Sequence, residues 1–155
     1  MPKFTTTRRV HLTVDQAFAI AADVASYKDF LPLLKRSTIR GERKRVGDIE
    51  TFDADLQIAV EKLGLRETFT SQVTTDTANN TVTATSSDGP MKALKAVWSI
   101  GGADDGKTEV SITVDYTMKS MMLQMVAGGL TDFAGQKVMQ AFEDRGRALY
   151  RKALS

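Results

Sequence analysis

Few residues of this chain could carry chemistry, and Glu67 is the acid whose position is unusual. Leu65, Phe69 and Val73 recur with a period of two, which places Glu67 on the same strand face as these apolar residues. A carboxylate in apolar surroundings needs a polar partner or a ligand, because burying it unpaired is costly. A bulge at Gly64 would instead turn it outward. Facing inward, Glu67 could bond the polar head of a ligand or act as a general base.

The usual partners of a catalytic carboxylate are missing from the sequence. The chain has no cysteine, which excludes thiolate chemistry. Its one histidine is His11, so few ligand sets for a metal ion remain. It also lacks a phosphate-binding loop, a dinucleotide-binding fingerprint and a nucleophile elbow. We therefore expect binding rather than catalysis, with no catalytic residue, no metal and no cofactor.

Positive charge is concentrated in residues 35–45, with the sequence KRSTIRGERKR. This basic segment carries six basic residues and one acidic residue, whereas the whole chain of 155 residues has a net charge of only +2. Such a run is a solvated face, a contact for anionic lipid headgroups or a contact for RNA phosphates. The lack of interleaved aromatic residues argues against nucleic acid. Membrane contact is therefore the expectation for Lys35, Arg36, Arg43, Lys44 and Arg45.

Residues 120–142, SMMLQMVAGGLTDFAGQKVMQAF, hold four of the seven methionines. A helical wheel predicts a sheet-facing side made of Met122, Leu123, Val126, Leu130, Phe133, Ala134, Val138, Ala141, Phe142 and Leu149. The opposite side holds Met121, Met125 and Met139 with Gly128, Gly135 and Gly146. Methionine is flexible and polarisable, so the first turns are either tolerant surface or a pliable apolar element at the mouth of a pocket, where Met121 and Met125 would contact a membrane.

These residues are positioned by one α+β domain over residues 1–155, as the 42% hydrophobic and 26% charged composition allows. Thr13 and Gln16 form a capping box that starts a helix at Val14, after a first strand over 4–12. A second short helical stretch follows and is limited by Pro32. Alternation and turn residues then predict strands at 35–46, 49–63, 65–73, 82–86, 94–100 and 110–118.

Strands joined by such short turns should form one antiparallel sheet of six to seven strands. Its dry face needs a cover, and a long helix from about Ser120 to Lys152 is the only element large enough. The space between helix and sheet would be packed core or a pocket. Trp98 is accordingly either a core residue or a ring in the pocket lining. Alternation and helical face assign the wall to Phe52, Leu56, Phe69, Met122, Val126 and Phe133.

Five segments taken together resemble the Coq10 branch of the START-like, helix-grip superfamily, which comprises coenzyme Q-binding proteins related to polyketide cyclases. They are DVASYKDFLPLLKRS at 23–37, TSQV at 70–73, DGPMKALKAVWSI at 88–100, SMMLQM at 120–125 and MQAFEDRGRALY at 139–150. The patterns YxxFLP and DGPxxxLxxxW are the more specific ones, and AFxxR is shared with near relatives. Two residues depart from the family pattern: Met91 replaces an aromatic residue, which would alter one wall, and Gly146 replaces an alanine.

The resemblance implies a curved antiparallel sheet around the C-terminal helix, two short helices after the first strand, and a hydrophobic tunnel for ubiquinone or another polyprenyl lipid. By the same resemblance, Tyr27, Phe30 and Pro32 lie near the tunnel entrance and Trp98 falls in a family motif. The implied role is that of a noncatalytic quinone chaperone for respiration and quinone biosynthesis. In this carrier hypothesis Glu67 meets the quinone head.

Two alternatives stay open beside the carrier. A cyclase-like or dehydratase-like enzyme would need two or more polar groups converging in the cavity, and bacterial relatives also include toxins that act on ribosome association. MPKFTTTRRVHL lacks the apolar core of a signal peptide, and the apolar run at 121–130 is short of the ~20 residues that span a bilayer. We expect a bacterial-type cytoplasmic protein, peripheral at the inner membrane, whose oligomeric state the sequence leaves open.

Overall fold

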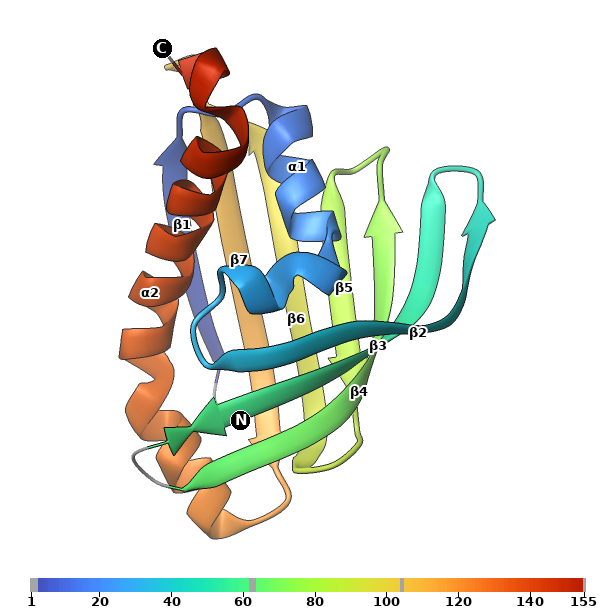
Figure 1. Ribbon diagram of the computed structural model, residues 1–155, viewed down its shortest axis with the longest axis vertical. Coiled ribbons are helices and arrows are strands. Elements are labelled where there is room, and N and C mark those ends of the chain that lie inside the picture. The colour runs from blue at the N-terminus through green and yellow to red at the C-terminus, as the bar shows by residue number, and fades with distance from the viewer. Residues whose placement is uncertain (1–2, 62–63, 104, 155) are drawn as a thin grey trace.

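One antiparallel sheet of seven strands forms the frame of the protein (Figure 1). The computed structural model describes residues 3–61, 64–103 and 105–154, without the side chains of 130–134 and 151–154. The strands are β1 (Lys3–Val10), β2 (Leu34–Val46), β3 (Ile49–Val60), β4 (Leu65–Asp76), β5 (Thr81–Ser86), β6 (Met91–Gly102) and β7 (Thr108–Met118). Their order in the sheet is β1-β7-β6-β5-β4-β3-β2. From β2 to β7, strands that follow one another in the chain are paired, and β1 pairs with β7. The predicted α+β class and antiparallel sheet are confirmed.

Tight turns set the register of the hairpins. Val46 pairs with Ile49, and Gly47-Asp48 forms the two-residue turn between them, with Gly47 at φ 61°. A positive φ at this place matches the twist of the flanking strands. Asn80, at φ 53°, is the last residue of the four-residue turn between Asp76 of β4 and Thr81 of β5. Both turns lie where the sequence predicted them.

Two helical segments connect β1 to β2: α1 (Val14–Ala22) and the 3-10 helix η1 (Val24–Asp29). Thr13 Oγ1 accepts a hydrogen bond from the Gln16 amide at 3.0 Å, and Gln16 Oε1 accepts one from the Thr13 amide at 3.0 Å. This is the predicted capping box, which satisfies two amides that the first turn leaves unpaired. The helix α1 buries Ala17, Ile20 and Ala21.

The long helix α2 (Met121–Leu154) lies along one side of the sheet and packs on β1, β7 and α1 (Figure 1). It was expected to cover the sheet alone, but α1 contacts β5, β6 and β7 and shares the task. A straight helix cannot follow strands that twist away from one another, so a second element fills the diverging space.

The face that α2 buries includes Phe142, Leu123 and Val126 of the predicted side but differs from that side elsewhere. Met139, assigned to the solvent side, is only 1% exposed, and Gly135 and Gly146 of that side are buried as well. Met122 and Leu149, assigned to the sheet side, are largely exposed. Between Gly135 and Gly146 the helix is therefore rotated relative to the wheel.

Close approach explains this rotation. A Cβ atom on Gly146 would lie 2.7 Å from Leu12 Cδ1, and one on Gly135 would lie 2.7 Å from Thr6 Oγ1. The helix α2 thus approaches its neighbours most closely at Gly135 and Gly146. At these positions the size of the side chain, rather than its hydrophobicity, decides which face of the helix can be buried.

Candidate functional site

An apolar cavity of about 260 Å³, here called the outer cavity, lies between the sheet, the loop before β6 and the first turns of α2. Glu67 is the one charged side chain among the described residues that line it. The remaining wall is almost entirely carbon and includes Ile58, Phe69, Val114, Met118, Leu123 and Val126. Such a lining favours an apolar ligand and gives a polar head few places to bind.

A second apolar cavity of about 140 Å³, here called the inner cavity, lies against η1 and the middle of the sheet. Tyr27, Leu56, Ser71 and Trp98 are part of its wall. Leu94 lines both cavities, so its half-buried side chain lies where they adjoin. A ligand longer than the outer cavity would have to pass Leu94 to reach the inner one.

Aromatic residues cluster beside the inner cavity, and two of them, Tyr27 and Trp98, line it. The Trp98 ring, 4% exposed, lies 5.2 Å from the Phe142 ring, and Tyr27 meets Phe30 edge-on at 5.9 Å. The Tyr27 hydroxyl donates to the Ala21 carbonyl oxygen. Burial raises the pKa of Tyr27, and a side-chain hydrogen bond with Trp98 opposes that shift. The residues of YxxFLP, LxxxW and AFxxR thus meet in space.

The DGP segment shapes the wall between β5 and β6. Asp88 Oδ2 accepts a hydrogen bond from the Thr70 amide at 3.0 Å, which ties the loop to β4. Gly89 has φ 57°, and a Cβ atom there would overlap the Thr68 carbonyl oxygen. Pro90 is then held as a buried part of the outer cavity wall. The DGP segment therefore allows the loop before β6 to lie in close contact with β4, because glycine adopts the positive φ and leaves room for the strand.

The predicted ligand-binding residues divide into three groups. Glu67, Phe69 and Val126 line the outer cavity, and Tyr27, Leu56 and Trp98 line the inner one. Glu67 lies on the inward register of β4, as the alternation indicated, and Met91, the departure from the family pattern, lines the outer cavity.

Four predicted ligand-binding residues, two of the wall and two of the entrance, lie outside both cavities, and the Phe133 side chain lies outside the described part of the chain. Phe52 is buried beneath Arg43, whose guanidinium carbon is 4.3 Å from its ring, and Phe30 packs under Arg145 at 5.5 Å. Met122 is 66% exposed, and Pro32 is half-buried away from the cavity walls. Alternation identifies inward residues, but packing then decides which of them border empty space.

The wall residues that sequence reasoning missed include Leu94, Ser71 and Tyr116. Leu94 and Ser71 fall inside the segments DGPMKALKAVWSI and TSQV, so a signal was present. Tyr116 lies in the alternating strand β7 and could have been found by its inward register.

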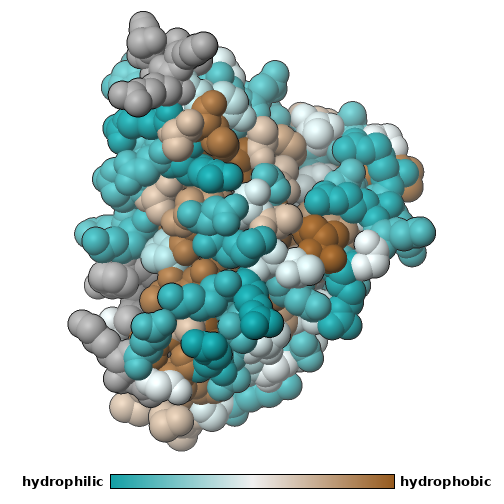
Figure 2. All heavy atoms as spheres, viewed as in Figure 1, coloured by the Kyte–Doolittle hydropathy of each residue, from teal (hydrophilic) through white to brown (hydrophobic). Residues whose placement is uncertain are grey.

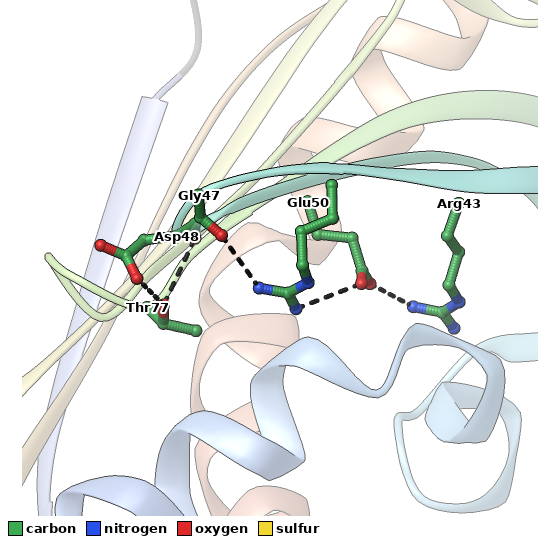
Figure 3. Close-up of polar contacts among 6 residues, drawn as sticks. Arg43, Gly47, Asp48, Glu50 and Thr77 are labelled. Carbon is green, nitrogen blue, oxygen red and sulfur yellow. Dashed lines mark hydrogen bonds and ion pairs between the residues drawn. The ribbon is translucent and has the colours of Figure 1, made fainter.

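The basic segment on β2 is largely neutralised. Arg43 and Arg45 contact Glu50 at 2.8 and 3.2 Å, and Figure 3 shows the pair formed by Arg43. A hydrogen bond from Arg43 holds the pKa of Glu50 below its usual value, with Arg45 adding to the effect. Two further pairs, at 3.5 and 3.0 Å, join Lys35 to Glu61 and Arg40 to Asp55. Arg36 and Lys44 are exposed and form no ion pair with a described residue.

Apolar surface is present at the start of α2. Met121 and Met125 are 84% and 76% exposed, next in the chain to Leu123 and Val126 of the outer cavity. Figure 2 shows apolar side chains coming to the surface in the seam between α2 and the strands. Among the described residues, no helix is long and apolar enough to cross a bilayer, and no group of three or more metal-ligating side chains is gathered.

Comparison with known proteins agrees with this architecture. The chain is 24% identical over 143 residues to the ribosome association toxin RatA of Vibrio cholerae, covering 91% of this chain and 92% of that protein. It is 27% identical over 135 residues to the mitochondrial coenzyme Q-binding protein coq10 of Schizosaccharomyces pombe, covering 86% and 80%. The solution structure of an 18 kDa protein from Caulobacter crescentus superposes with a TM-score of 0.80 at 26% identity, covering 97% and 99%.

A family model also matches residues 10–143, which include β2 to β7 and most of α2. The chain belongs to the family described as polyketide cyclase / dehydrase and lipid transport.

Proposed function

We propose that this protein binds an apolar lipid, with an isoprenoid quinone as the leading candidate, and does so without catalysing a reaction. The observation that carries the proposal is the outer cavity, whose described lining residues are apolar apart from Glu67 and Tyr116. Burying apolar ligand surface there yields ~25 cal/mol per Å². The match to a lipid transport family and to a coenzyme Q-binding relative supports the same class of ligand.

The size of the cavity limits how the ligand is held. At about 260 Å³ the outer cavity is smaller than the ~300–1,000 Å³ typical of ligand pockets, so a long polyprenyl tail exceeds it. Part of the tail would then lie against the first turns of α2 or stay in the bilayer. Met121 and Met125 offer the exposed apolar surface for such peripheral membrane contact. The neutralised basic segment would contribute less to that contact than its sequence suggested.

The two alternatives have different structural requirements. A cyclase-like or dehydratase-like reaction needs converging polar groups, and Glu67 with Tyr116 is the pair it would have to use. A contact with ribosomal RNA needs unpaired cations, yet the basic segment forms ion pairs with Glu50, Asp55 and Glu61. Both requirements are met less well than the requirement for an apolar cavity.

Lipid that co-purifies with the protein tests the proposal directly. Organic extraction followed by mass spectrometry is expected to recover an isoprenoid quinone from the wild-type protein. Val126→Phe, which fills the outer cavity, should reduce the recovery severalfold, whereas Gln136→Phe on the exposed side of the same helix should not. Recovery of no isoprenoid quinone, together with no uptake of added quinone, would refute the carrier function.

A further inference from the structure

Ser71 is a buried polar residue whose side chain is left without a hydrogen bond. It is 0% exposed, and its hydroxyl oxygen has no partner among the described residues. Other buried hydroxyls of the sheet do have partners: Ser37 Oγ, for example, donates to the Ala25 carbonyl oxygen at 2.9 Å. A buried hydroxyl without a partner is disfavoured, so its presence in a packed sheet calls for a reason.

The position of Ser71 is the second observation. Ser71 lines the inner cavity. The other polar side chains of that wall already have hydrogen-bond partners, so none of them is available to Ser71. The Tyr27 hydroxyl donates to the Ala21 carbonyl oxygen and is also bonded to Trp98. A water molecule needs two to four polar partners to be stable in a cavity, and Ser71 alone would supply one. An oxygen carried by an otherwise apolar molecule needs only that one.

We infer that Ser71 hydrogen-bonds an oxygen on the leading end of the bound lipid, a carbonyl or hydroxyl group that has passed Leu94 into the inner cavity. This inference rests on the proposed lipid-binding function and deepens it by assigning the head to the inner cavity and the tail to the outer one. Ser71 and Glu67 lie on the same face of β4 four residues apart, or ~13 Å along a strand, so the two residues mark opposite ends of the site. Glu67 then lies beside the tail rather than the head.

The single tryptophan makes the inference measurable. Trp98 lines the inner cavity, so a quinone ring that reaches Ser71 lies close enough to quench its fluorescence. Decylubiquinone is the probe, and decylbenzene, which has the same tail without oxygens, is its counterpart. Ser71→Ala removes the hydroxyl, and Ser99→Ala is the matched control on the exposed face of β6, beside Trp98 in the sequence.

Wild-type protein should show saturable quenching by decylubiquinone. Ser71→Ala should weaken that binding about tenfold, as expected for one lost hydrogen bond in an apolar site, and Ser99→Ala should leave it within about twofold. Decylbenzene, followed by thermal shift, should bind wild type and Ser71→Ala equally. Leu94→Phe should abolish the quenching while decylubiquinone still raises the Tm, because the path between the cavities is blocked.

Equal affinity of Ser71→Ala and Ser99→Ala for decylubiquinone would overturn the inference and leave the carrier function standing. Binding that raises the Tm without quenching Trp98, and that is lost in Glu67→Gln, would overturn it by placing the head in the outer cavity. A Tm of ligand-free Ser71→Ala several degrees below wild type would also overturn it, since the hydroxyl would then have a structural partner. Failure of wild type to bind either probe would instead remove the proposed function itself.

Discussion

Phe142 is a fully buried residue of α2 that contacts the sheet. It has no exposed surface and stacks on Trp98, with ring centroids 5.2 Å apart. Aromatic pairs of this kind stabilise beyond their buried area. Since Trp98 also borders the inner cavity, packing at Phe142 helps to hold one wall of the candidate site.

Replacing Phe142 by alanine should lower the free energy of unfolding by about 3–5 kcal/mol, because the change removes a buried ring and leaves a cavity beneath Trp98. Phe142→Leu should cost less, since most of the volume is kept. Urea denaturation followed by Trp98 fluorescence measures both. Leu149→Ala, on the same helix and half-exposed, is the control; a loss at Phe142 no larger than at Leu149 would contradict the packing role.

Glu50 gives the protein a dependence of stability on pH. The hydrogen bond from Arg43 lowers its pKa below the ordinary 4.5 in the folded state. A carboxyl group with a depressed pKa stabilises the fold above its unfolded pKa, and this contribution is lost as the pH falls through the folded value. The Tm of wild type should therefore fall more between about pH 5 and pH 3 than that of Glu50→Gln. Glu42→Gln should behave like wild type, and an unchanged pH profile in Glu50→Gln would show that the ion pair adds nothing.

At the scale of elements, the loop between β5 and β6 contains the DGP segment and forms part of the outer cavity wall. Ser86 Oγ, at the end of β5, donates to the Thr70 carbonyl oxygen at 2.6 Å, and Asp88 of the loop accepts from the Thr70 amide. Both backbone polar groups of Thr70 therefore hold this segment against β4. Gly89 makes this approach possible, and Pro90 completes the outer cavity.

Gly89→Ala should therefore destabilise the protein by about 2 kcal/mol or more, because it combines a positive φ with an overlap against the Thr68 backbone. Gly47→Ala provides the matched comparison: it has a similar φ of 61° but no atom within 4 Å of its Cβ position, so about 1 kcal/mol is expected. Thermal unfolding of the two variants separates overlap from backbone strain. Equal losses would mean that close approach at Gly89 has no cost of its own.

At the scale of the whole molecule, apolar and charged surface lie on different elements. The exposed methionines are at the start of α2, beside the outer cavity, whereas the basic segment lies on β2 and is paired with carboxylates on β3 and at Glu61. Membrane binding through the methionines would be driven by burial of apolar surface. Membrane binding through the basic segment would weaken as the salt concentration rises.

The double change Met121→Ser and Met125→Ser should reduce sedimentation with vesicles severalfold, in neutral and anionic lipid alike, because it removes apolar surface beside the cavity. The double change Arg36→Glu and Lys44→Glu reverses the charge of the two residues of the basic segment that form no ion pair with a described residue. It should reduce sedimentation with anionic vesicles only, and only in low salt. If the charge changes abolish binding and the serine changes do not, the basic segment rather than α2 contacts the membrane.

Much of this fold could be predicted from the sequence because its signals are local. The capping box at Thr13, the turn at Gly47-Asp48 and the alternation that turns Glu67 inward each depend on residues within a few positions of one another. The same alternation identified Leu56, Phe69 and Trp98 as inward, and the structure places them on cavity walls.

Only the tertiary structure decided which inward residues border a cavity and which charges stay free. Phe52 is inward but covered by Arg43, and Met139 is buried because Gly135 and Gly146 let α2 approach its neighbours closely. The ion pairs that neutralise the basic segment join one strand to the next. In each case the contacting residue lies far along the chain or on another element. Packing and Coulomb attraction act through space, so a sequence pattern of a few residues does not reveal these partners.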